Sequence, residues 1–141
     1  MPLKRSTILI IDSDLGSVFW LGQVLDAAGC EALPAKNVPD AKSLLAELKV
    51  MVDLLIVRSS MPGAAAFAES LCRSQGSLKT IGLRADDEEL PAVKPQMDAW
   101  LHTPFVNDET ARFHYLGLIS RVLGKGLMLS AVLLATAGDF R

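Results

Sequence analysis

The stretch that decides the fold is residues 54–63, LLIVRSSMPG. Its first four residues are all apolar, and a short continuous apolar run is typical of a strand buried on both faces of a parallel sheet. The predicted strand covers residues 52–57. Met61-Pro62-Gly63 predicts a turn immediately afterwards. Arg58 therefore stands where a buried parallel strand ends, which is where open α/β sheets form their sites.

The rest of the chain repeats this pattern, with short apolar runs alternating with segments of helical periodicity. Strict alternation predicts an α/β fold of the flavodoxin-like, doubly wound type, with five parallel strands in the order 2-1-3-4-5 and five helices. The strands are expected at residues 7–11, 31–35, 52–57, 80–84 and 99–102. Helices are expected to follow each of them, and the one within 86–97 should be short or broken because of Pro91 and Pro95.

In this strand order, sites form outside the carboxyl ends of the first and third strands. Asp12-Ser13-Asp14 follows the first strand, and Asp14 or Ser13 is expected to cap the next helix. The other polar residues at strand ends are Arg84 and Thr103. The candidate site therefore consists of Asp12, Ser13, Asp14, Arg58, Arg84 and Thr103.

The composition limits the function classes. The chain has 141 residues and a net charge of −2, so it is long enough for one domain with a core and carries no broad basic field for nucleic acid. Cys30 and Cys72 lie in apolar surroundings and form no metal-binding cluster, which favours reduced thiols in a cytoplasmic protein and no metal. The sequence contains no phosphate-binding glycine loop and no nucleophile–base pair. Nothing in it therefore indicates a cofactor or an enzyme.

The chain is expected to divide into two parts near residue 125. Residues 1–125 form the domain, and 126–141 form an apolar extension, too short for the roughly 20 residues that cross a bilayer. Its apolar side chains point in too many directions for a free surface helix. They are expected to pack on this domain, on a second copy or on another protein, and they include Leu127, Met128, Leu129, Val132 and Leu133.

Four landmarks between residues 7 and about 124 resemble the receiver domains of bacterial response regulators. They are Asp12-Ser13-Asp14, the Met61-Pro62-Gly63 turn three residues after position 58, the end of the fourth strand at Arg84, and Thr103-Pro104-Phe105. The resemblance implies a phosphoacceptor aspartate at position 58, a second acid at 13, a hydroxyl at 84 and a lysine at 103. Only the first acid, Asp12, is present. The chain therefore resembles a pseudo-receiver that lacks the phosphoacceptor and a Mg²⁺ site.

A guanidinium has no nucleophilic lone pair at neutral pH, so Arg58 cannot accept a phosphoryl group. Two arrangements remain open for it. In the first, Arg58, helped by Arg84, pairs with Asp12 or Asp14 and supplies the positive charge internally. In the second, Arg58 points to solvent. Trp100 matches the receivers' switch aromatic, and it either stacks with Arg84 or packs as an ordinary strand residue.

The function expected from this resemblance is phosphorylation-independent signalling or scaffolding through protein–protein contact. Receivers use their fourth helix, fifth strand and fifth helix as an output face, and a homodimer through the fifth helix and the extension is the preferred form. One alternative is a response regulator with a displaced acceptor at Asp12, Asp14 or Asp53. Another is a flavodoxin-like ligand-binding protein or enzyme. The candidate interface residues are Phe113, Leu116, Leu127, Met128, Leu129, Val132 and Leu133.

Overall fold

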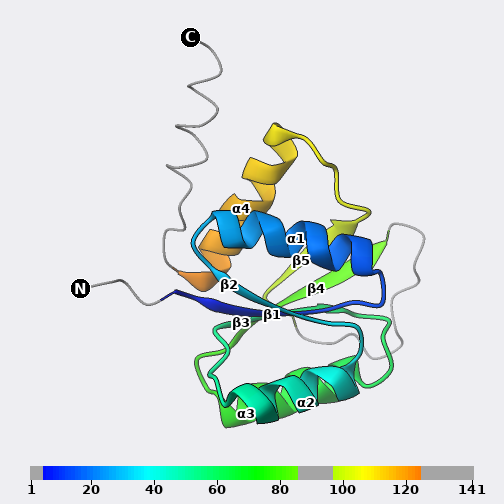
Figure 1. Ribbon diagram of the computed structural model, residues 1–141, viewed down its shortest axis with the longest axis vertical. Helices are drawn as coiled ribbons and strands as arrows, with labels where there is room; N and C mark the ends of the chain where they lie inside the picture. The colour runs from blue at the N-terminus through cyan, green and yellow to red at the C-terminus, as the bar shows by residue number, and fades with distance from the viewer. Residues whose placement is uncertain (1–4, 86–96, 125–141) are drawn as a thin grey trace.

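The computed structural model describes residues 5–85 and 97–124 (Figure 1). Its sheet has five parallel strands in the order β2-β1-β3-β4-β5. The flavodoxin-like strand order predicted from the sequence is confirmed. The strands are β1 (Thr7–Ile11), β2 (Glu31–Ala35), β3 (Leu54–Arg58), β4 (Lys79–Ala85) and β5 (Ala99–Thr103), and the helices are α1 (Leu15–Ala27), α2 (Val38–Leu48), α3 (Ala64–Ser74) and α4 (Glu109–Leu123).

The helices cover both faces of the sheet, with α1 and α4 on one side and α2 and α3 on the other (Figure 1). Successive side chains of a strand point to opposite faces. Ile8 and Ile10 therefore belong to the core under α1 and α4, whereas Leu9 and Ile11 belong to the core above α2 and α3. Because both faces are covered, β1 and β3 are apolar at nearly every position.

Three helices begin at a side-chain cap. Asp14 accepts a hydrogen bond from the Ser17 N–H at α1, Asn37 from the Asp40 N–H at α2, and Asp108 from the Ala111 N–H at α4. Such caps satisfy backbone donors that have no partner within the helix. Asp14 and Ser13 were the two residues predicted to cap the first helix, and in the structure the cap is Asp14. The start of α3 differs, because Gly63 takes a left-handed conformation (φ 80°) and redirects the chain at little steric cost.

The start of the third strand differs from the prediction, and two predicted segments lie outside the described residues. The third strand begins at Leu54 and not at residue 52, because the N–H of Val52 donates to the Gln75 side chain (2.8 Å) instead of joining the sheet. The helix expected within 86–97 and the extension 126–141 lie outside the described residues, except Met97. The last described helix, α4, thus corresponds to the fifth helix predicted from the sequence.

Within residues 5–85 and 97–124, no helix is long and apolar enough to cross a membrane.

Candidate functional site

The carboxyl ends of β1, β3 and β5 meet at one edge of the sheet, called here the carboxyl edge. Asp12 follows β1, Arg58 is the last residue of β3, and Thr103 is the last residue of β5. Parallel strands place these three side chains at the same level, although they are far apart in the sequence. The structure brings all three into one hydrogen-bonded group, called here the Arg58 network.

The centre of the Arg58 network is a two-pronged ion pair. Nε of Arg58 donates to Oδ1 of Asp12 at 3.2 Å, and Nη2 donates to Oδ2 at 2.8 Å. The side chain of Asp12 is 1% exposed and that of Arg58 is 12% exposed. Two parallel N–H···O bonds between charged groups fix orientation as well as distance. Of the two arrangements left open for Arg58, the structure has the ion pair, and its acid is Asp12, the residue after β1.

Thr103 completes the network from the other side. Nη1 of Arg58 donates to the Thr103 hydroxyl oxygen at 2.7 Å, and Thr103 is buried. The guanidinium therefore connects the ends of β1 and β5 to the end of β3. The sequence placed Thr103 at this edge but did not identify it as a hydrogen-bond acceptor for Arg58, because a threonine carries no charge that would mark it as a partner.

Asp12 is also held by the backbone. Its Oδ1 accepts the N–H of Asp14 at 3.3 Å, and its own N–H donates to the Ala35 carbonyl of β2 at 3.1 Å. A buried carboxylate is tolerated only when its lone pairs are satisfied and its charge is compensated. Arg58 and the turn after β1 meet both conditions, so the turn and the ion pair support each other.

The side chains of Asp14 and Ser13 stay outside this network, and both residues are exposed. The Asp14 carboxylate accepts the Ser17 hydroxyl (3.0 Å) and the Ser17 N–H (3.3 Å). These hydrogen bonds, the hydroxyl first, hold the pKa of Asp14 below its usual value, and the positive charge of Arg58 adds to the effect. Asp14 therefore serves α1 as a cap and leaves Asp12 as the partner of Arg58. Ser13 lines a shallow surface hollow beside the network, together with Leu15, Lys36, Asn37, Arg58, Ser60, Met61 and Pro62.

Trp100 packs on a glycine of the neighbouring strand. Gly82 and Trp100 are paired in register between β4 and β5. A Cβ atom on Gly82 would lie 2.5 Å from Cζ3 of Trp100, closer than real contacts allow. Gly82 is thus needed for the position of the indole ring, and nothing in the sequence identified it. Arg84 lies on the same face of the sheet one diagonal away, paired with His102, and its stacking on Trp100 stays a prediction.

An aromatic cluster holds the segment that follows Thr103. Trp20 of α1 stacks on Phe105 (ring centroids 5.2 Å apart) and meets Tyr115 of α4 edge-on (5.7 Å). The Trp20 indole N–H donates to Asn107 at 2.8 Å, and the Tyr115 hydroxyl accepts the N–H of Val106 at 2.9 Å. The peptide bond between Thr103 and Pro104 is cis. Trp20 is half-buried and joins α1 to the connection between β5 and α4.

One candidate interface residue requires a correction. Leu116 was expected on a partner-binding face, but it is 0% exposed and packs in the core beneath α4 beside Tyr115 and Ile119. The helix is rotated so that Tyr115 points inward, where its hydroxyl binds the Val106 N–H. Phe113, on the outer side, is 39% exposed. The other candidates, Leu127, Met128, Leu129, Val132 and Leu133, lie outside the described residues.

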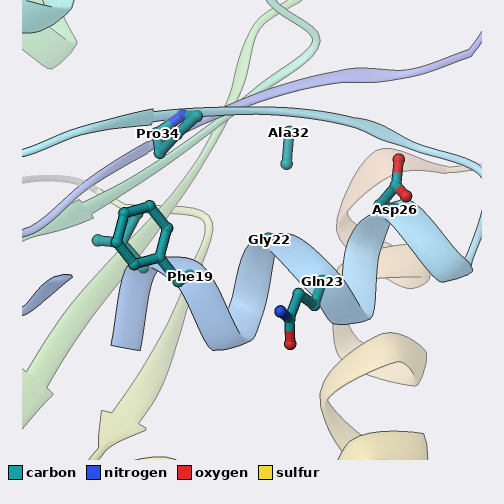
Figure 2. A pocket seen from close by; sticks show the side chains of 7 residues that line it. Phe19, Gly22, Gln23, Asp26, Ala32 and Pro34 are labelled. Atoms are coloured by element: carbon teal, nitrogen blue, oxygen red, sulfur yellow. The ribbon is translucent and has the colours of Figure 1, made fainter. Parts of the chain in front are cut away.

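A second hollow lies between α1 and the edge strand β2, away from the Arg58 network. Figure 2 shows Phe19 beneath Pro34 at one end and Asp26 at the other, with the small residues Gly22 and Ala32 between them. Phe19 is 57% exposed, and Asp26 is engaged by Arg5 at 2.9 Å. The hollow is a shallow trough, and nothing in the sequence marked any of its residues as functional.

The carboxyl edge does not suit a receiver-type magnesium ion. Magnesium requires several oxygen ligands, usually carboxylates, and both oxygens of the buried Asp12 are bound to Arg58. In the described part of the chain, no group of three or more His, Cys, Asp or Glu side chains could hold a metal.

No protein-family model and no curated protein matches the sequence. Solved structures do match its fold. A response regulator receiver protein from Burkholderia phymatum superposes with a TM-score of 0.67 at 18% identity, covering 87% of this chain and 98% of that one. The chemotaxis protein CheY4 of Vibrio cholerae gives a TM-score of 0.67 at 20% identity, covering 84% and 99%. NtrX from Brucella abortus gives 0.69 at 16% identity, covering 98% of this chain but 29% of NtrX. The chain therefore has the fold of receiver domains.

Proposed function

We propose that this chain is a pseudo-receiver: a non-enzymatic signalling or scaffolding domain that binds another protein without taking up a phosphoryl group. The observation that carries the proposal is the Arg58 network. Arg58 occupies the position that the receiver resemblance assigns to the phosphoacceptor, and it binds Asp12 and Thr103, at the positions of the first acid and the lysine.

The network gives a physical reason why the chain would not need phosphorylation. In a receiver, a metal ion and a lysine balance the acidic cluster. Here the guanidinium provides that positive charge permanently, since arginine is not deprotonated in proteins. The ends of β1, β3 and β5 are thereby joined in one arrangement, so the domain presents one surface to its partner.

The partner is proposed to be a protein in the cytoplasm, because the structures that share this fold are named as response regulators or chemotaxis proteins. The face formed by β5, α4 and the extension 126–141 is the proposed contact region. Phe113 is the described candidate on its outer side. A second copy of this chain, forming a homodimer, is the simplest partner.

The geometry favours this proposal over a displaced phosphoacceptor. Both Asp12 oxygens are bound by Arg58. Asp53 lies at the amino end of β3 and accepts the Thr7 N–H at 2.8 Å, at the opposite edge of the sheet. Asp14 is exposed, but the resemblance offers it neither lysine nor metal ligands. A ligand-binding role would rest on the two shallow hollows, and a flavin or nucleotide retained in the purified protein would favour it.

The test is an NMR amide titration of the full chain with Mg²⁺ and beryllofluoride, which mimics a phosphoryl group. The expected result is that the amide signals of Asp12, Arg58 and Trp100 do not move. The matched control is the variant Ser13→Asp/Arg58→Asp/Thr103→Lys, which restores the acids and the lysine of the receiver pattern and should respond to Mg²⁺. Saturable shifts in the unmodified chain would overturn the proposal.

A further inference from the structure

The trough between α1 and β2 has a large side chain at one end and a gap next to it. Four residues lie along one side of α1, since they follow one another at intervals of four, three and four positions: Leu15, Phe19, Gly22 and Asp26. The ring of Phe19 stands beneath Pro34, whereas Gly22 has no side chain (Figure 2). One helical turn beyond the ring, the trough is therefore open.

The large apolar side chains of this stripe are exposed to solvent. Leu15 is 45% exposed and Phe19 is 57% exposed, and they stand one helical turn apart. Pro34 of the neighbouring strand is exposed as well and extends the apolar surface from α1 onto β2. Neighbouring exposed apolar side chains of this kind indicate a surface at which another protein binds.

The edge of β2 favours a helix over a strand as the occupant of the trough. Among the described strands, β2 is at one edge of the sheet. The N–H of Glu31 and the carbonyl of Ala35 are bonded toward β1, so the alternate residues Ala32 and Pro34 direct their backbone groups to the outer edge. Because proline has no N–H, Ala32 provides the one outward N–H within β2, and an added strand would pair poorly.

The two ends of the stripe carry opposite charges. Asp26 lies at the end of the trough near the last turn of α1. Lys36 lies at the opposite end, where it lines the neighbouring hollow together with Leu15. Asp26 pairs with Arg5 at 2.9 Å and Lys36 with Asp40 at 3.7 Å, but both pairs are exposed. Exposed pairs contribute little to stability, so these charges can be shared with a second molecule.

We propose that a second copy of this chain occupies the trough, with the two α1 helices antiparallel about a twofold axis between Phe19 and Gly22. Phe19 of each copy then enters the gap at Gly22 of the other copy. Lys36 of each copy lies toward Asp26 of the other. A twofold contact requires a surface that is complementary to itself, and the ring beside a gap and the charges at opposite ends give this surface that property.

This contact is separate from the face proposed for a protein partner. Helix α1 packs at β2 and α4 packs at β4, so two copies joined through the trough leave the α4 face of each copy to a different protein. The pairing through α1 does not rest on the pseudo-receiver proposal. A second copy bound at the α4 face is the competing arrangement, and the experiment separates the two.

The experiment is sedimentation velocity of the full chain over a series of concentrations up to about 1 mM. Gly22→Leu fills the gap, and its Cβ atom would make only an ordinary 3.8 Å contact with Ala32. Leucine favours helix more than glycine does, so the variant should unfold at the same temperature as the unmodified chain or a higher one. Phe19→Glu removes the ring. The matched control is Met51→Glu, because Met51 is 59% exposed and lies between α2 and β3.

The expected result is a dimer whose dissociation constant rises at least about tenfold in Gly22→Leu and in Phe19→Glu. Met51→Glu should change it by less than about twofold. A chain that stays monomeric throughout the series would overturn the proposal, as would a dimer that Gly22→Leu leaves intact. A dimer that is lost in Phe113→Glu and kept in Phe19→Glu would place the contact on α4 and overturn it too.

Exchanging the two charges tests the antiparallel arrangement. Lys36→Glu and Asp26→Lys should each weaken the dimer, because like charges then meet across the axis. The double variant Lys36→Glu/Asp26→Lys should recover the affinity of the unmodified chain, since opposite charges face each other again. A double variant weaker than both single variants would overturn this arrangement. None of these results bears on phosphotransfer, because the titration with beryllofluoride tests the Arg58 network separately.

Discussion

Asp12 and Arg58 form a two-pronged ion pair at the carboxyl edge, with N···O distances of 3.2 and 2.8 Å and an Asp12 side chain that is 1% exposed. A buried pair of this kind contributes little compared with apolar packing, but removing one partner leaves an uncompensated charge. The stability of the domain should therefore depend on keeping both residues or replacing both.

Arg58→Met should lower the free energy of unfolding by about 3 kcal/mol, since Asp12 then remains buried without a cation. The double variant Asp12→Leu/Arg58→Met should recover most of this loss, because no buried charge is left. Urea unfolding at pH 7 measures both. The control is Arg73→Met, whose exposed pair with Glu69 should contribute less than about 0.5 kcal/mol. If Arg58→Met unfolds like the unmodified chain, the ion pair has no structural role.

Thr103→Val should cost about 1–2 kcal/mol, because it removes the oxygen that accepts Nη1 of Arg58 at 2.7 Å while keeping the shape of the side chain. Thr103→Ser retains the hydroxyl and should lose much less. Thermal unfolding of the two variants side by side makes the comparison. Equal losses would mean that the methyl group and not the hydrogen bond matters at this position.

Asp14 should contribute to stability in a pH-dependent way. The pKa of its carboxyl group is lowered in the folded state, mainly by the Ser17 hydroxyl, so its contribution is present above the unfolded value of about 3.8 and is lost as the pH falls through the lower folded value. Asp14→Ala should cost about 1 kcal/mol at pH 7.

Asp14→Asn keeps the cap without titrating, and it should reduce the loss of stability between pH 5 and pH 2 (about the window in which a carboxyl of this kind titrates). The urea midpoints of the variant and the unmodified chain, measured across that pH range, give this difference. An unchanged acid profile in Asp14→Asn would assign the acid sensitivity to other carboxylates.

Gly82→Ala should displace the Trp100 ring and destabilise the fold by about 1–3 kcal/mol, since the new Cβ would lie 2.5 Å from the indole. The Trp100 indole N–H signal, distinguished from that of Trp20 with a Trp20→Phe variant, should shift. Gly22→Ala is the control, because its Cβ would make an ordinary 3.8 Å contact with Ala32 and should stabilise α1. If the Trp100 signal does not shift in Gly82→Ala, the strand accommodates the new Cβ atom and the indole ring keeps its position.

The sequence was sufficient to predict the architecture. Continuous apolar runs such as residues 54–57 identify buried strands, and their alternation with helical periodicity allows few sheet orders. The same reasoning placed Asp12, Arg58 and Thr103 at one edge, since it needs only the points at which strands end. These are local patterns, and a parallel sheet converts them directly into positions.

Only the tertiary structure decided which side chains meet. Asp12 and Asp14 were equivalent candidates for Arg58 until the first turn of α1 engaged Asp14 through Ser17. Gly82 became necessary only when β5 placed Trp100 against it. Leu116 was expected on the interface beside Phe113, but it lies in the core because α4 buries Tyr115, Leu116 and Ile119 together. Hydrogen bonding and close packing depend on differences of a few tenths of an ångström, and periodicity along the chain contains no information at that scale.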